Sequence, residues 1–190
     1  MSTPLALAAV TALLRIHIQA AVGGEWTPEL PRTRVITLPP DHVAVTDETG
    51  PLVNVFLCDV QPGAALLRDR PAPGAAAGDA MPVRLSYLVS AHGILPLDAD
   101  ILLGQVLAAV RRVPVLAPAD IRHMLDPDSD DPSGSMPRVF RREALTLAET
   151  VDHLTITLRP LSLTDCAQLW QGLRTPLRPC VVLDVDGVSL

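Results

Sequence analysis

The sequence predicts one α/β (α+β) domain over residues 1–190, with a central mixed β-sheet packed by helices. The first observation is composition: 48% of the residues are hydrophobic but only 3% are aromatic, so the core has to be built from aliphatic side chains. The second is the alternation of Ala- and Leu-rich runs with β-branched runs, which indicates helices and strands in turn. The third is that no internal repeat or linker offers a boundary at which to divide the chain.

Start and stop signals place the first three predicted helices. One covers residues 5–21 and is followed by Gly23-Gly24. The next covers residues 101–112, with Asp98 and Asp100 at its entrance and Arg111-Arg112 in its last turn, as the helix dipole favours. A short third helix begins at Pro118, because proline suits the first turn.

The last predicted helix begins after Ser162, which is its expected N-cap, with Asp165 in the capping-box position. It ends before Pro176. Because one face of this helix is apolar, we expect it to pack on the sheet. That face carries Cys166, Leu169, Trp170 and Leu173.

β-branched runs bounded by Pro, Gly and Asp indicate the strands. The run over residues 52–60 is apolar at most positions, which is typical of a central strand covered on both faces, whereas shorter runs suit the edges. Within residues 151–160 the aliphatic side chains alternate onto one face. The other predicted strands cover residues 33–38, 42–45, 83–93 and 180–190.

Two segments lack a sustained period and are predicted to be long loops. They cover about residues 61–82 and residues 126–137. The second opens like a calcium loop, but Asp131 stands where the turn needs glycine and Pro137 stands where a bidentate glutamate is needed. A solvated loop is therefore the favoured interpretation.

Charge and cysteine usage limit the possible classes of protein. Fifteen basic residues against twenty-one acidic ones give a net charge of −6, a poor footprint for a nucleic-acid binder. The apolar run near the N-terminus is shorter than the roughly twenty residues that cross a bilayer, and it lacks the features of a secretory signal. Cys58, Cys166 and Cys180 lie singly in apolar runs, as is typical of buried thiols in a reducing compartment. We expect a cytoplasmic protein that binds neither nucleic acid nor membrane.

The sequence contains no motif of catalysis or cofactor binding. It has no nucleophile elbow, phosphate loop or dinucleotide fingerprint. The five histidines are spread over different elements without the spacing of metal ligands. We expect no catalytic residue, no cofactor and no metal, and therefore no enzyme.

Two polar features leave alternatives open. His92, Asp98 and the 61–82 loop could line the pocket of a small-ligand-binding or hydrolytic domain, although a turn is the more ordinary interpretation of His92-Gly93. Asp184 and Asp186 share a face of the last strand, either as paired carboxylates or as edge-strand charges that oppose aggregation.

Two helices carry more apolar surface than a helix that is buried on one side needs. The second predicted helix is apolar nearly all round from Ile101 through Val110, and the helix over residues 5–21 is similar, so each is either sandwiched or pressed on another subunit. Trp170 fits an interface anchor or a core residue equally well. Oligomerisation is therefore expected from the residues alone.

Five stretches, in this order, resemble the tube-terminator (cap) proteins of extracellular contractile injection systems, phage-tail-like particles with an inner tube and a contractile sheath. The specific part is VNVFL followed by the LSL…LW…L.TP.RP ending. The five stretches are LALAAVTALLR, PLVNVFLCDVQPGAALLRDR, PVRLSYLVSAHG, LLGQVLAAVRRVPVLAPADI and LSLTDCAQLWQGLRTPLRPCVVLDV.

The resemblance implies a tail-terminator-like structural protein without cofactor or catalytic residues. Such a protein assembles as a ring of six, sits on the end of the inner tube and contacts the last sheath layer. Its expected partners are other copies of the chain, the tube protein and the sheath protein. The sequence departs from the family at Cys180, where a small polar residue is expected, and in lacking a longer C-terminal arm after Leu190.

The strand over residues 180–190 is expected to join a neighbour's sheet, where main-chain hydrogen bonds would fix its register. A transient assembly adaptor that does not remain in the particle is a further alternative. The candidate residues of a subunit or sheath interface are Trp170, Val181, Val182, Leu183, Val185 and Val188.

Overall fold

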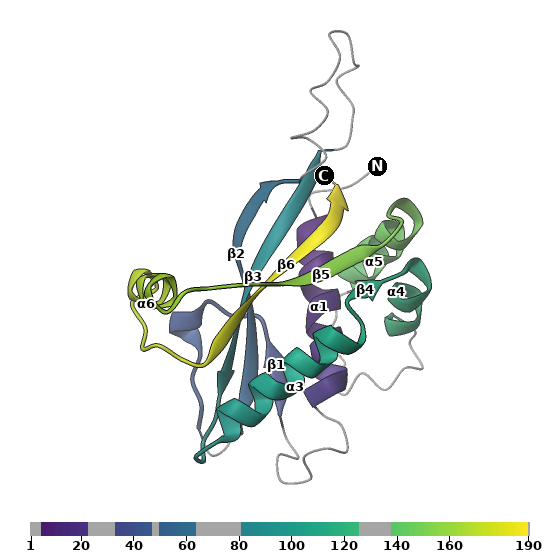
Figure 1. The fold of residues 1–190 in the computed structure, drawn as a ribbon. Helices are drawn as coiled ribbons and strands as arrows, with labels where there is room; N and C mark the ends of the chain where they lie inside the picture. The colour runs from purple at the N-terminus through teal and green to yellow at the C-terminus, as the bar shows by residue number, and fades with distance from the viewer. Residues whose placement is uncertain (1–4, 23–32, 47–49, 64–80, 126–137, 190) are drawn as a thin grey trace.

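A six-stranded mixed sheet forms the centre of the molecule, in the order β1-β2-β3-β6-β5-β4 (Figure 1). β1 runs parallel to β2, and the other neighbouring pairs are antiparallel. The predicted fold class is confirmed. The strands are β1 (Arg34–Ile36), β2 (Leu52–Pro62), β3 (Pro82–His92), β4 (Val115–Leu116), β5 (Leu154–Arg159) and β6 (Cys180–Ser189).

Helices lie on both sides of this sheet. Figure 1 shows α6 on one side and the other α-helices on the opposite side. Among the described helices, none combines the length and the apolar character that a membrane crossing requires. The helices are α1 (Ala6–Val22), α3 (Asp98–Arg112), α4 (Pro118–Met124), α5 (Arg138–Thr150) and α6 (Leu163–Gly172), with a short 3₁₀ helix, η1 (Pro40–His42).

This computed structural model describes most of the chain. The predicted loop over residues 126–137 lies outside the described residues. Most of the predicted loop over residues 61–82 does too, although its two ends belong to β2 and β3. The described residues are 5–22, 33–46, 50–63, 81–125 and 138–189.

The predicted helices all form, and α5 is an addition that was not predicted. Ala144, Leu147 and Ala148 are buried at three-and-four spacing, so α5 turns one narrow face to the core. Arg122 of α4 donates a hydrogen bond through Nη2 to the Ala148 carbonyl (3.2 Å), which ties the two helices together.

The strand predicted over residues 42–45 is wrong: η1 covers its start, and the residues after η1 pair with no strand in the part of the chain that the structure describes. Asn54 of β2 explains where the pairing stops. Its side chain accepts a hydrogen bond from the Leu38 amide and donates one to the Leu38 carbonyl, both at 2.9 Å. The chain beyond β1 is thus held by a side chain, and Pro39-Pro40 has no amide donors with which to continue a ladder.

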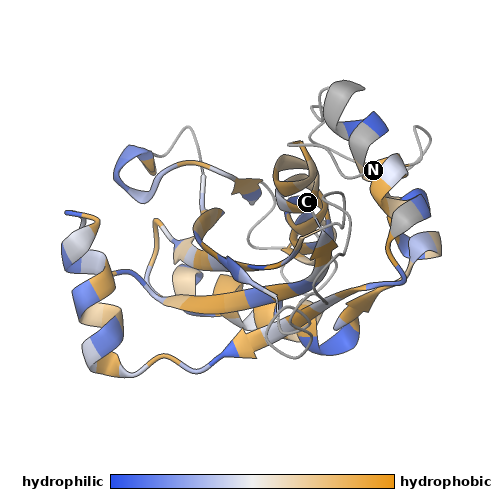
Figure 2. Cartoon of the chain, turned by 90° about the horizontal axis from the view of Figure 1, so that it is seen from above, coloured by the Kyte–Doolittle hydropathy of each residue, from blue (hydrophilic) through white to orange (hydrophobic). Residues whose placement is uncertain are grey.

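The main core lies between one face of the sheet and α1, α3 and α5. Figure 2 shows hydrophobic residues concentrated on the central strands. Tyr87 is the one tyrosine of the chain and is fully buried there, with its hydroxyl 3.0 Å from Thr11 Oγ1. Other fully buried residues of this core are Ala9, Leu13, Ile18, Val53, Val55, Leu85, Val89, Leu102, Val106 and Leu183.

β6 lies between β3 and β5, so its prediction as an edge strand is wrong. The alternating Asp184 and Asp186 suggested an edge, but each carboxylate has an arginine partner on a flanking strand: Arg159 and Arg84 respectively. Paired in this way, the charges are compatible with a central strand. Gly187 lies beside them with φ of 96°, and a Cβ there would collide with the His153 carbonyl.

Candidate docking surfaces

The outer side of α3 and the turn before it expose a band of apolar side chains. Leu95 and Leu97 are 68% and 69% exposed, and the band continues onto the helix. The inner side of α3 packs on α1 and β3, so this helix is buried on one face and open on the other. The large apolar side chains of the band are Ile94, Leu95, Leu97, Ile101 and Leu107.

A shallow hollow of about 510 Å³ lies at the C-terminal end of this band. It is lined by Gly104, Leu107 and Ala108 and bordered by Arg111 and Arg112. Gly104 leaves the floor open, since a Cβ there would meet nothing within 4 Å. The exposed leucine and the two arginines give this open surface both apolar and cationic character.

The turn before α3 is held by Asp98, which is buried. Its Oδ2 accepts hydrogen bonds from the amides of Ile94 (3.0 Å) and Leu95 (2.8 Å). Leu97 follows in the left-handed region with φ of 72°, which is costly for a branched side chain. The exposed leucines are thus carried by a tightly bonded turn.

His92 lies close in sequence to this turn but does not form a reactive pair with Asp98. Its Nε2 is 3.0 Å from Ser90 Oγ, and both side chains are buried. Burial, together with the nearby Arg178, lowers the pKa of His92 to about 4, so the ring is neutral at pH 7. Asp98 and His92 each complete local structure, and this arrangement does not favour the hydrolytic alternative.

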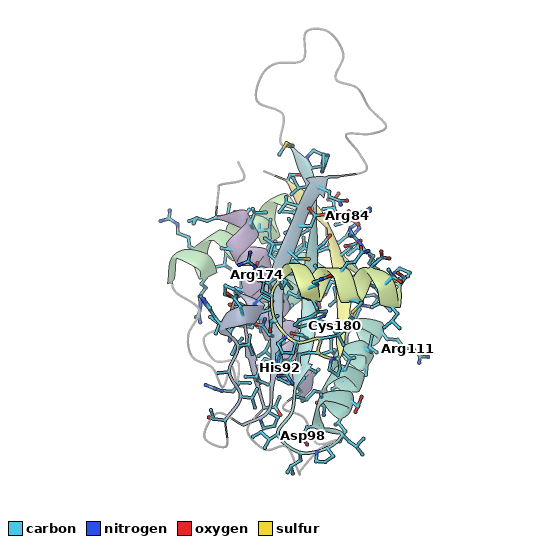
Figure 3. The ribbon with its side chains drawn as sticks, turned by 90° about the vertical axis from the view of Figure 1, so that its left-hand side faces the viewer. Arg84, His92, Asp98, Arg111, Arg174 and Cys180 are labelled. Atoms are coloured by element: carbon cyan, nitrogen blue, oxygen red, sulfur yellow. The ribbon has the colours of Figure 1, made fainter. Side chains whose placement is uncertain are left out.

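A small apolar cluster under α6 covers part of the second sheet face. Trp170 is 1% exposed and packs on Leu88 of β3 and Val182 of β6, as its helical spacing predicted. In Figure 3, Cys180 is labelled close to α6. Ser162 caps the helix by accepting a hydrogen bond from the Asp165 amide at 3.1 Å, so that predicted cap is confirmed.

Next to this cluster, the same sheet face carries a buried polar network. Arg159 donates through Nε to Asp184 Oδ2 (3.0 Å) and through Nη2 to Ser86 Oγ (2.8 Å). Ser86 Oγ donates in turn to Asp184 Oδ1 (2.9 Å). A buried carboxylate is costly unless it is paired and hydrogen-bonded, and Asp184 has both kinds of partner.

A second and more exposed ion pair lies beside this network on the same face. Arg84 Nε donates to both oxygens of Asp186, at 2.9 and 3.1 Å. The paired-carboxylate interpretation of Asp184 and Asp186 therefore has no support in this geometry, because each acid is committed to a different arginine.

The structure places the six predicted interface residues inside the protomer. Val181 is half-buried and the other five are at most 4% exposed. The β6 backbone pairs with β3 on one side and β5 on the other, so this strand is not free to join a neighbour's sheet. The exposed band on α3 was signalled only by the all-round apolar character of that helix.

The described residues include no group of three or more His, Cys, Asp or Glu side chains placed to hold a metal ion. The calcium-like run over residues 126–137 lies outside them. The arrangement as a whole offers apolar and charged docking surfaces.

Comparison with known proteins agrees with this description. The profile of the Pvc16 N-terminal domain family matches residues 7–190, nearly the whole chain. The chain belongs to the Pvc16 N-terminal domain family. Together with the two solved structures described next, this match confirms the predicted resemblance to tube terminators. No curated protein sequence matches the chain.

Two solved structures share the fold of this Pvc16 N-terminal domain. The sheath/tube terminator of PVC, an extracellular contractile injection system, in its extended state is 19% identical with a TM-score of 0.52. The tube-terminating cap of the anti-feeding prophage is 17% identical, also with a TM-score of 0.52. Each match covers 100% of this chain but only 57% and 56% of the solved chains. This chain therefore spans little more than half the length of either.

Proposed function

We propose that this protein is a structural cap of a contractile injection particle. In this role, six copies form a ring that terminates the inner tube and contacts the last sheath layer. Membership of the Pvc16 N-terminal domain family over residues 7–190 is the observation that carries the proposal. The protein would be made in the cytoplasm and incorporated into the assembled particle, with the tube and sheath proteins as partners.

The outer side of α3 is the surface best suited to contact between copies. It joins exposed aliphatic side chains to a hollow with a cationic rim, a combination of apolar centre and polar border that is typical of interfaces. A closed ring needs a head-to-tail contact, in which this band meets a different surface of the next copy. The arginine rim favours a surface that carries carboxylates.

The six predicted residues of the α6–β6 region remain a second proposed interface. Trp170 and Val182 could meet another subunit only if α6 moved away from the sheet, whereas Leu183, Val185 and Val188 lie in the main core on the opposite face. We therefore place the first contact at α3, and a contact through the α6–β6 region only after assembly has begun.

Ile101→Glu tests the role of the α3 surface in ring formation. Ile101 is 39% exposed in the apolar band, so a glutamate there is tolerated in the monomer but leaves a charge buried in the interface. We expect the wild type to form rings on tube ends and this variant to associate at least about 100-fold more weakly. Native mass spectrometry and electron microscopy of tube ends measure both. Leu163→Glu, at an 81% exposed site on α6, is the matched control and should assemble normally.

The possible results of these experiments test the cap role and the α3 contact separately. Rings from Ile101→Glu as well as from wild type would move the contact elsewhere and leave the cap role intact. A wild-type chain that stays monomeric with tube protein present, or a deletion strain whose particles keep normal length, would refute the cap. Absence of the chain from mature particles that need it for assembly would identify an adaptor instead.

A further inference from the structure

We propose that Cys166 and Cys180 are a thiol pair that reacts with low-molecular-weight disulfides, such as oxidised glutathione, to form an intramolecular disulfide between α6 and β6. This covalent site is independent of the proposed cap function. It rests on the position of the two sulfur atoms within the α6 cluster.

The two sulfur atoms already face each other. Cys166 Sγ of α6 lies 3.6 Å from Cys180 Sγ at the start of β6, and both residues are half-buried and reduced. A disulfide needs a separation of about 2.05 Å, so the sulfurs have to approach by about 1.5 Å. Cys166 belongs to a ten-residue helix that packs on the sheet through a small cluster, so the approach requires α6 or the cysteine side chains to shift.

Burial limits the reactivity of the Cys180 thiol, and Trp170 partly offsets this limit. Its Nε1 donates a hydrogen bond to Cys180 Sγ at 3.3 Å, which stabilises a thiolate as it forms. Burial, the largest influence, raises the pKa of the Cys180 thiol to about 11. Cys180 is therefore slow to attack an external disulfide, and Cys166 is the entry point.

The reaction balances as two thiol–disulfide exchanges. Cys166 loses its proton and attacks one sulfur of oxidised glutathione, which breaks that S–S bond and releases one glutathione thiolate. Cys180 then loses its proton, attacks the Cys166 sulfur of the mixed disulfide and displaces the second glutathione. The protein gives up two electrons and two protons, and one oxidised glutathione becomes two reduced ones.

The product fixes α6 on the second sheet face. The bridge closes the segment between α6 and β6, which contains the left-handed Arg174 and Pro179, whose carbonyl accepts from the Ala91 amide at 2.9 Å. The same chain therefore holds α6 loosely where glutathione is reduced and tightly where it is oxidised.

The full-length Cys58→Ser variant, treated with oxidised glutathione, tests the pair. Cys58 donates its thiol to the Ser86 carbonyl, so serine keeps the donor and removes the third thiol. We expect the intact mass to fall by about 2 Da, peptide mapping to join Cys166 with Cys180, and the Tm to rise by about 5–10 °C. A reducing agent should reverse all three changes.

Single variants show whether the two residues act in the predicted order. On the Cys58→Ser background, Cys180→Ser should accumulate a glutathione adduct on Cys166, and Cys166→Ser should react at least about tenfold more slowly. Neither should gain thermal stability. If the Cys58→Ser chain stays reduced, stops at the glutathione adduct or forms only intermolecular disulfides, the proposal fails.

Trp170 supplies a local readout. In a Trp26→Phe background it is the single remaining tryptophan, and a disulfide formed beside its ring should quench its emission. With Cys58→Ser also present, an unchanged emission on loss of both remaining thiols would show that no disulfide forms beside this ring and would overturn the assignment.

Discussion

The two faces of the sheet are stabilised in different ways. The face under α1, α3 and α5 is a continuous aliphatic core in which buried Tyr87 has its hydroxyl bonded to Thr11. The other face holds the small Trp170 cluster, an Arg159–Asp184–Ser86 network and the buried Ser90–His92 pair. Dispersion and the hydrophobic effect dominate the first face, whereas specific geometry dominates the second. The first face should set stability, and the second should be sensitive to pH and oxidation.

Leu13→Ala should have the largest effect, because it opens a cavity in the aliphatic face. Leu13 is fully buried between α1 and the sheet, so we expect the free energy of unfolding to fall by about 3–4 kcal/mol. Urea denaturation measures the change. Leu163→Ala, which shortens a leucine that is 81% exposed, should change it by less than about 0.5 kcal/mol. Equal effects of the two would show that the first face is not the main core.

Asp184→Ala should lower stability by about 2–3 kcal/mol, because it leaves the Arg159 guanidinium and the Ser86 hydroxyl without their acceptor. Asp186→Ala breaks the neighbouring, more exposed pair with Arg84 and should cost less than about 1 kcal/mol. Adding Arg159→Met to Asp184→Ala should recover part of the loss. The network would be unimportant if Asp184→Ala and Asp186→Ala were indistinguishable by urea denaturation.

His92 should make the stability of the protein depend on pH. Its folded pKa of about 4 lies below the ordinary 6.5, so between these values the unfolded chain binds a proton that the folded chain does not. Stability contributed by the neutral ring is therefore lost as pH falls from about 6.5 toward 4, by up to about 3 kcal/mol. The nearby charged groups are Arg178, which also lowers this pKa, and Asp98, which is bonded to backbone amides.

Urea denaturation from pH 7 to pH 4 measures this slope. His92→Gln should flatten it, whereas His42→Gln, at an exposed site, should leave it unchanged. His17 also has a pKa lowered by burial, so part of the slope should persist in His92→Gln. An identical slope in wild type and His92→Gln would show that His92 does not contribute to the pH dependence of stability.

Local signals in the sequence were enough to predict much of the fold. Ser162 with Asp165, and the acidic start and basic end of α3, mark helix ends because the interactions involved span only a few residues. Strand order was not predictable in this way. Asp184 and Asp186 reach partners 25 and 102 residues away, so an alternating acidic strand looked like an edge when it was central.

Local sequence signals were equally unable to predict which surfaces are exposed for docking. Trp170 was placed on the correct helix face, but helical spacing does not distinguish a side chain buried in its own chain from one buried against a neighbour. The exposed band on α3 depends on which side of the helix meets α1, and that contact forms between segments far apart in the sequence.

The central position of β6 has a consequence for how the protein is made. All the other strands precede β6 along the chain, so a ribosome releases β1–β3 and β4–β5 before the strand that joins them. Until residues 180–189 emerge, the nascent chain carries two partial sheets with unsatisfied backbone edges at β3 and β5. Insertion of β6 is then a late, long-range step of folding, and the sheet can close only after almost the whole domain has been synthesised.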